Sequence, residues 1–138
     1  MPGCIIVHPL RHAFSPVRFT RGPKHAEAVA REAESLNEHV LRWEGRAAEA
    51  GANGVRRRRL EGAGATLVRI ELPAGTRAAE HAHSHEQFVE VLSGGGTLTT
   101  AAGERAFGPG DVFHFPPDTP HAATFERDTV LLEVNVGA

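Results

Sequence analysis

Histidine is the residue type in this sequence with the clearest chemical potential, and it is unevenly distributed along the chain. The 138 residues include nine histidines, one cysteine and no tyrosine. Imidazole is the commonest metal ligand in proteins, and it changes charge near neutral pH. Five histidines fall in two short stretches: His81, His83 and His85 in the first, and His114 and His121 in the second.

The first stretch has the spacing that lets an extended chain direct several side chains at one ion. Side chains at i and i+2 of a strand project from the same face, so an extended chain places His81, His83, His85 and Gln87 together. Imidazole nitrogens and amide oxygens both bind divalent cations. A histidine from the second stretch would complete the set. We therefore predict a metal site rather than isolated, hydrogen-bonded core histidines.

The elements that must position these side chains are β-strands. After residue 54, short β-rich runs alternate with turn signals such as Gly94-Gly95-Gly96. In residues 65–72, apolar side chains alternate with Arg69 and Glu71, as in a half-buried strand. Many short strands at regular spacing predict an all-β sandwich or barrel. The expected strands are residues 55–60, 65–72, 87–92, 97–100, 104–107, 112–115, 121–126 and 129–136.

The chain before residue 54 has a different pattern. Apolar residues recur at steps of four and three from Val29 to Ala47, which predicts an amphipathic α-helix over about residues 24–50. We therefore divide the chain into an N-terminal extension, residues 1–53, and a β-barrel domain, residues 54–138. We expect the helix to pack against the barrel or against a partner subunit.

The bulk charge and the apolar runs exclude several classes of partner. A net charge of −2 gives no general attraction to nucleic acid or anionic membranes. No apolar run approaches the roughly 20 residues of a membrane span. Residues 1–14 hold only a three-residue apolar run, too short for a signal peptide. We expect a cytoplasmic protein that acts on a small-molecule substrate, with no nucleic-acid or membrane partner.

Four consecutive arginines, Arg56 to Arg59, form the one strongly basic run. On a strand, two of them point to each face, so the four cannot form one basic surface. We interpret the run as an exposed edge strand, because charged edges resist aggregation. The alternative is that one of the inward-pointing pair binds a substrate carboxylate.

The spacing of glycines and histidines resembles the first of two motifs of the cupin family. That motif reads G-x5-H-x-H-x3-E-x6-G. In this chain it runs from Gly75 through His81, His83 and Gln87 to Gly94. Every spacing matches, and the one departure is a glutamine in place of the glutamate.

The second cupin motif, G-x5-P-x-G-x2-H-x3-N, also matches in spacing. It runs from Gly110 through Pro116 and Asp118 to His121 and Phe125. Asp118 stands in place of the glycine and Phe125 in place of the asparagine. The resemblance implies an all-β double-stranded β-helix, the cupin jelly-roll barrel, over roughly residues 54–137, here with an N-terminal α-helical extension. Cupins often dimerise, so a homodimer is an assembly that the resemblance implies.

The resemblance implies a divalent transition metal, Zn, Fe, Ni, Mn or Co, held by His81, His83, Gln87 and His121. A rival register would use His83, His85 and Glu90 and restore the carboxylate. It requires glycines near positions 77 and 97, where the chain has arginine and threonine. We therefore prefer the register that ends on Gln87, in which Glu90 faces away from the cavity.

The ligand set shapes the expected chemistry. Three neutral imidazoles and an amide leave the charge of the ion uncompensated, so it should polarise carbonyls and stabilise enolates strongly. We expect a Lewis-acid isomerisation, cyclisation or tautomerisation of a keto- or hydroxy-bearing substrate, such as a sugar acid, keto acid or polyketide. One alternative is a non-haem iron dioxygenase at the same site. Another is a non-enzymatic ligand-binding or sensor cupin.

Groups that could move a proton are few, because the chain has no tyrosine. His114, near the second motif, and His85 and Glu86, near the first, are the candidate catalytic residues. The alternative interpretations are that His114 is a structural residue of the barrel wall and that Glu86 is solvated.

Overall fold

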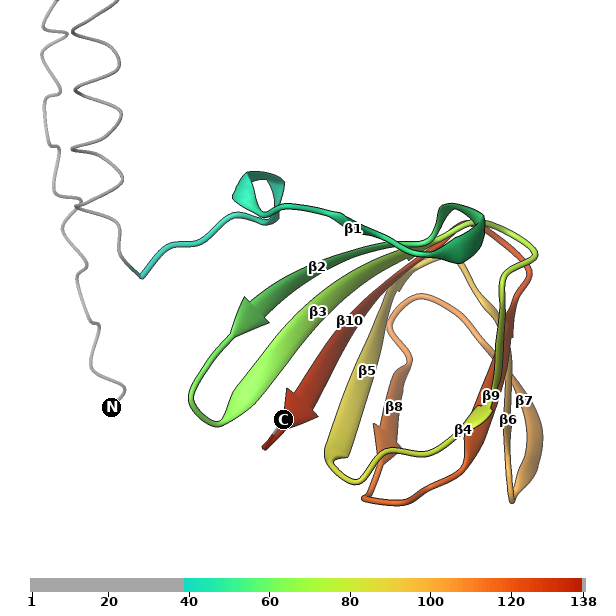
Figure 1. Cartoon of the computed structure of the whole chain (residues 1–138). Helices are drawn as coiled ribbons and strands as arrows, with labels where there is room; N and C mark the ends of the chain where they lie inside the picture. The colour runs from blue at the N-terminus through green and yellow to red at the C-terminus, as the bar shows by residue number, and fades with distance from the viewer. Residues whose placement is uncertain (1–38, 138) are drawn as a thin grey trace, which may run out of the picture. The chain divides into compact units, whose positions relative to one another are not determined.

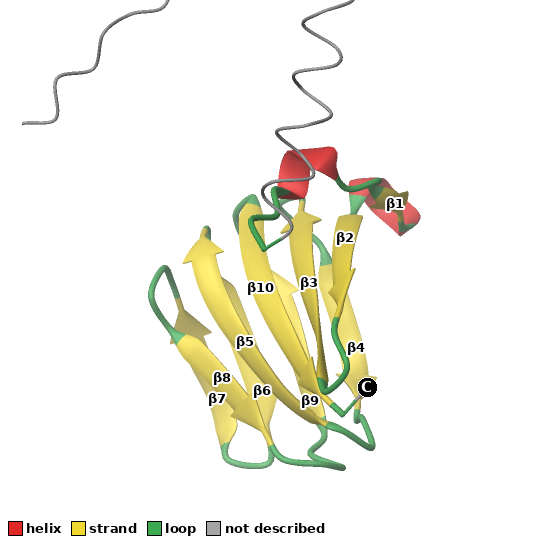
Figure 2. Cartoon of the chain, turned by 90° about the vertical axis from the view of Figure 1, so that its left-hand side faces the viewer, coloured by secondary structure: helices red, strands yellow, loops and turns green. Residues whose placement is uncertain are grey.

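A computed structural model describes residues 39–137, in which ten strands form two antiparallel sheets (Figure 1). The chain divides into two compact units, Met1–Val40 and Leu41–Ala138. The second unit contains all ten strands. Helical structure among the described residues is limited to two short 3₁₀ turns, η1 (Trp43–Gly45) and η2 (Ala52–Gly54), drawn in red in Figure 2.

The two sheets differ in size and face each other (Figure 1). The six-stranded sheet has the order β1 (Glu49–Ala50), β2 (Arg56–Glu61), β3 (Ala65–Leu72), β10 (Thr129–Val136), β5 (Glu86–Ser93) and β8 (Val112–Phe115). The four-stranded sheet has the order β4 (Arg77–His81), β9 (His121–Phe125), β6 (Gly96–Thr100) and β7 (Gly103–Phe107). This all-β arrangement confirms the predicted jelly-roll barrel.

Alternation along the strands places the core between the sheets. In β3 every second residue is buried, beginning with Thr66 and Val68. The same period places Val89 and Val91 of β5 inside, at 3% and 1% exposure. Each strand therefore turns one face to the interior and one to solvent. The buried apolar core consists of Val55, Val68, Ile70, Leu72, Val89, Val91, Phe107, Phe115, Phe125 and Leu131.

All eight strands predicted from the sequence are present, each within one residue of its predicted ends. Two strands were missed, β1 and β4. The sequence of β4, Arg-Ala-Ala-Glu-His, has no β-branched or aromatic residue. Its extended form comes from pairing with β9, which local composition does not reveal.

The predicted helix over residues 24–50 is wrong at its C-terminal end. Residues 24–38 lie outside the described part of the chain. Beyond them the chain forms the η1 turn and then β1, which pairs with β2 through Glu49 and Ala50. Backbone hydrogen bonds to the sheet take the place of helical ones here. Among the described residues, no helix is long and apolar enough to cross a membrane.

Candidate metal centre

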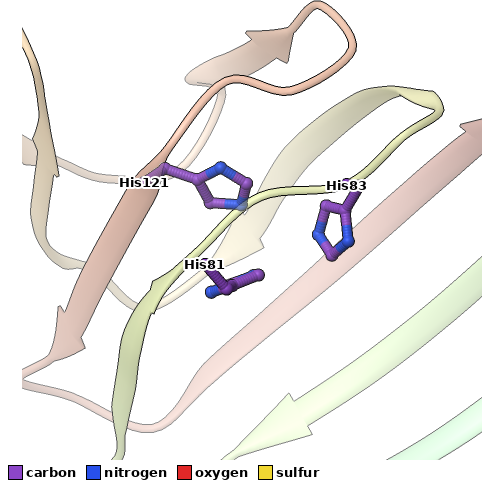
Figure 3. A group of neighbouring side chains, drawn as sticks. All are labelled: His81, His83 and His121. Carbon is purple, nitrogen blue, oxygen red and sulfur yellow. The ribbon is translucent and has the colours of Figure 1, made fainter.

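Three histidines meet at one end of the barrel (Figure 3). His81 is the last residue of β4 and His121 the first residue of β9, and the two are directly paired across the sheet. His83 follows two residues after β4. One ring nitrogen from each of the three lies within 4.8 Å of the others. The ring centroids are 4.4 Å apart for His81 and His121, and 4.9 Å apart for His81 and His83.

Backbone carbonyls set the direction of two of these rings. Nδ1 of His81 lies 2.7 Å from the carbonyl oxygen of Ala79, and Nδ1 of His121 lies 2.8 Å from that of Thr119. A carbonyl only accepts hydrogen bonds, so each Nδ1 carries the proton and each Nε2 keeps its lone pair. Histidine ligands of metal ions are held in this way. The donor set therefore fits a divalent metal ion.

The second-motif loop fixes His121 and His83 relative to each other. The ring of Phe115 stacks on that of His121, with centroids 3.8 Å apart. The backbone N–H of Asp118 donates to the carbonyl of His83 at 2.6 Å. Asp118 has a φ of 62°, a left-handed conformation that glycine adopts freely and aspartate tolerates better than most residues. This explains how aspartate replaces the glycine of the motif.

Gln87 joins the site from the other sheet. Its side chain is only 3% exposed and lines a cavity of about 60 Å³ together with His81 and His121, which we call the metal chamber. Nε2 of Gln87 donates to Oδ1 of Asn135 at 2.8 Å. This hydrogen bond holds the amide and leaves Oε1, the atom that binds cations, for another partner.

The surroundings of His83 and His121 favour the neutral imidazole, the form that binds metals. Burial lowers the pKa of His83, and the neighbouring His81, His85 and His121 lower it further. Burial also lowers the pKa of His121; the hydrogen bond to Thr119 opposes this effect, and His81 adds to it. Both shifts favour lone pairs over protons at neutral pH.

The chain between His81 and Gln87 is not extended throughout, contrary to our expectation. It bends at Ser84 and His85 before β5 begins. The ring of His85 consequently stacks on that of His83, with centroids 4.9 Å apart, instead of joining the three-histidine cluster. Its Nε2 is buried and has no hydrogen-bond partner among the described residues. His85 therefore lies beside the cluster.

The structure does not bring His114 and Glu86 to the cluster. Nε2 of His114 lies 3.0 Å from a carboxylate oxygen of Glu86, and the His114 ring stacks on Phe88. Phe88 and His114 are paired across β5 and β8, next to the pair formed by Gln87 and Phe115. Alternate residues face opposite sides of a sheet. Because Gln87 faces the chamber, His114 and Glu86 face outward.

The backbone conformation at Gly75 and Gly94 agrees with the preferred register of the first motif, in which both positions are glycines. Gly75 and Gly94 both have a φ of 86°, a conformation that favours glycine. A Cβ at Gly94 would also overlap the backbone of Asp128 and Thr129. Glu90, the carboxylate of the rival register, is exposed on the outer face.

The residues that form the barrel and the histidine cluster match a known protein family. The family model of the cupin domain matches residues 68–135, a range that contains all four predicted ligands. The chain contains a cupin domain. No curated protein sequence is significantly similar to it.

Solved cupin structures share the fold. An RmlC-like cupin from Shewanella frigidimarina is 25% identical, covers 74% of this chain and 93% of its own, and has a TM-score of 0.68. Ectoine synthase from P. lautus is 19% identical over 71% and 77% of the two chains, with a TM-score of 0.63. The polyketide cyclase RemF from Streptomyces resistomycificus is 20% identical over 72% and 79%, with a TM-score of 0.60. Cupins of this fold therefore include several kinds of enzyme.

Glu133 is a residue of the cupin chamber that the sequence analysis missed. It lines the metal chamber from β10, paired with Val89 on one side and Val68 on the other. Burial raises its pKa above 4.5, although Arg57, Arg59, His81 and His85 act to lower it. The available signal was that Glu133 is the one acid of β10 and alternates with the inward-facing Leu131 and Asn135.

Proposed function

We propose that this cupin is a metal-dependent enzyme that shifts a proton on a keto- or hydroxy-bearing small molecule, as in isomerisation, cyclisation or tautomerisation. The observation that carries the proposal is the convergence of one ring nitrogen each from His81, His83 and His121. Glu133 lines the same chamber as His81 and His121. A divalent ion bound there, with Gln87 as fourth ligand, supplies a Lewis acid for the substrate oxygen.

The amide of Gln87 and its partner Asn135 keep the ligand set neutral. A carboxylate ligand would cancel part of the positive charge that polarises the substrate. The hydrogen bond from Gln87 to Asn135 also limits rotation of the amide, so its oxygen is held ready for the ion. The same strand pair, β5 and β10, carries Glu133.

Glu133 is the group that accepts and returns the proton in this proposal. Its carboxylate shares the chamber with the ligands, and the raised pKa makes it a stronger base than a solvated glutamate. The chamber walls next to it, Val89, Leu98 and Phe113, are apolar and keep bulk water away from the reacting atoms. His85, beside the cluster, is the remaining candidate among the predicted catalytic residues for passing the proton onward.

A reaction in D₂O without oxygen tests this function. Metal-loaded protein is incubated with a panel of keto acids, uronic acids and hydroxy ketones, and deuterium incorporation next to the carbonyl is followed by NMR. We expect exchange on at least one class of compound to persist without oxygen and to drop at least 100-fold in Glu133→Gln. Turnover that requires oxygen would instead support the dioxygenase. Tight binding without exchange would support a sensor.

A further inference from the structure

Two larger cavities share wall residues with the metal chamber. One, of about 510 Å³, shares the apolar side chains of Leu98, Phe113 and Phe115. The other, of about 630 Å³, shares Ala78. Both volumes lie in the range of small-molecule sites. The second cavity, which we call the arginine cavity, holds charge that the proposed reaction does not use.

The lining of the arginine cavity is suited to an anion. Arg57 and Arg77 both line it, together with the polar side chains of Asn53 and Thr76. No aspartate or glutamate is among its lining residues. Guanidinium groups carry their charge at all physiological pH values and bind carboxylates through two parallel hydrogen bonds.

The four-arginine run explains why Arg57 is available. On the outer face of β2, Arg58 forms an ion pair with Glu71 at 3.4 Å. On the inner face, Arg59 forms one with Glu49 at 3.3 Å. Arg57, also on the inner face because it is paired with the buried Ile70, has no ion pair within 4 Å among the described residues.

The guanidinium of Arg57 lies beside the backbone at Gly51. Its Nη1 lies so close to Gly51 that a Cβ there would crowd it. Arg57 is half-buried, and the cost of removing a guanidinium from water is best offset by an anionic partner. Arg57 forms no ion pair within 4 Å among the described residues, and Glu133 interacts with it through its charge alone. The guanidinium can therefore take an external anion as its direct partner.

The arginine cavity lies within reach of the metal chamber along one strand. Ala78 lines both, and His81 follows three residues later on β4, a separation of about 10 Å along an extended chain. Arg57 also acts electrostatically on Glu133, which lies in the chamber. One elongated molecule can therefore contact both places.

We propose that Arg57 and Arg77 bind a carboxylate of the substrate, at the end remote from the oxygen that meets the metal. This inference rests on the proposed function and adds the substrate class, an acid whose carboxylate and reacting oxygen lie roughly 10 Å apart or somewhat less. The arginines hold the acid end while the reacting carbon lies beside Glu133. They are binding residues, and they take no part in proton transfer.

The test compares two probes that differ in the remote group alone. Titration calorimetry measures binding of 2-oxooctanedioate and of 2-oxooctanoate, which has a methyl group in place of the remote carboxylate, to full-length protein with and without Zn²⁺. The variants are Arg57→Gln, Arg77→Gln and the double variant. Arg56→Gln, on the outer face of the same strand, is the matched control. Zinc content and melting temperature are measured for every variant.

We expect wild type and Arg56→Gln to bind 2-oxooctanedioate at least 10-fold more tightly than 2-oxooctanoate. The ratio should fall to below 3 in the double variant and to intermediate values in the single variants, with zinc content unchanged. Equal binding of the probes by wild type, or an unchanged ratio in variants that keep wild-type melting temperatures, would overturn the inference. If the wild-type protein does not bind zinc, the proposed function is refuted. The inference about the two arginines is still tested in that case, because the ratio of the two affinities can be measured without metal.

Discussion

At the scale of single residues, two backbone carbonyls decide which nitrogens are free to bind a metal. The carbonyl of Ala79 accepts a hydrogen bond from Nδ1 of His81, and the carbonyl of Thr119 accepts one from Nδ1 of His121. Each carbonyl lies two residues before the ring that it orients. The ligand atoms are therefore aimed before any ion arrives. Such preorganisation raises affinity, because no side-chain freedom has to be lost when the ion binds.

Removing a ligand should abolish metal binding, whereas removing a neighbour should not. We expect His81→Ala and His121→Ala to weaken zinc binding by roughly 100-fold or more, since even residues that only support ligands contribute 10- to 100-fold. His85→Ala, which removes a ring stacked outside the cluster, should bind zinc within about 10-fold of wild type by the same measure. The measurement is competition with a fluorescent chelator. The reverse pattern would establish the rival register.

The protonation of His83 and His121 predicts a pH profile for metal binding. Their pKa values lie below 6.5, so zinc affinity should be nearly constant above pH 6.5 and decrease below it, as protons compete for the lone pairs. Just below pH 6.5 the unfolded chain binds more protons at these two histidines than the folded chain does. The metal-free protein should therefore also lose stability as the pH falls through this window.

Two titrations measure this behaviour: zinc affinity and the urea midpoint of the metal-free protein, each from pH 8 to pH 5. An affinity that already declines between pH 8 and pH 7 would show that the pKa values are raised instead. A urea midpoint of the metal-free protein that rises as the pH falls below 6.5 would show the same.

The sequence allowed the candidate ligands to be predicted but not the candidate base. The spacing of the two cupin motifs pointed to His81, His83, Gln87 and His121. The structure brings the three histidines together, and Gln87 lines the same chamber as His81 and His121. Glu133 was missed because its place depends on the pairing of β10 with β3 and β5, which are distant in sequence. The outward orientation of His114 depends in the same way on its pairing with β5.

At the scale of elements, one turn fixes the register of the strand that carries Gln87. Gly94 directly follows β5, in the turn that leads to β6 in the other sheet; it has a φ of 86° and is packed against Asp128 and Thr129. A shift of one residue would turn Gln87 outward and Glu90 inward. The glycine thus determines which side chain reaches the chamber.

Substitution at this turn should be costly. We expect Gly94→Ala to lower the free energy of unfolding by about 3 kcal/mol, because of its backbone conformation and the overlap of the new Cβ. Gly64→Ala is the control, since no atom lies within 4 Å of a Cβ there and its φ is not in the left-handed range. Urea denaturation measures both. Equal stability of the two variants would show that the turn does not constrain the register.

The ends of strands were predicted correctly where apolar and polar residues alternate strongly. The prediction failed where pairing with a distant strand determines the structure. Residues 65–72 alternate clearly, and β3 has these ends. The apolar spacing up to Ala47 suggested a helix, but residues 49 and 50 pair with β2. The helical spacing of apolar residues is a local pattern, so it does not show that the last residues of the segment pair with the edge of a sheet.

At the scale of the whole barrel, the residues of the proposed metal site come from both sheets. His81 and His121 come from the four-stranded sheet, and Gln87 comes from the six-stranded one. An ion bound to all of them crosslinks the sheets at the end where the chamber lies. Metal binding should therefore contribute to the stability of the entire barrel.

We expect zinc to raise the melting temperature measured by calorimetry. At a free concentration 100 times Kd, binding to the folded state alone adds about 2.7 kcal/mol. Gln87→Ala should reduce the increase, and His121→Ala should remove it. An unchanged melting temperature on adding zinc or a chelator would show that the folded barrel does not bind the ion selectively.

The most direct test is anomalous X-ray scattering from crystals of the Zn²⁺-loaded full-length protein. We predict one strong peak about 2.0–2.2 Å from Nε2 of His81, Nε2 of His121, a ring nitrogen of His83 and Oε1 of Gln87. A peak between His114 and Glu86, or one bound by His85 without Gln87, would contradict the proposed centre.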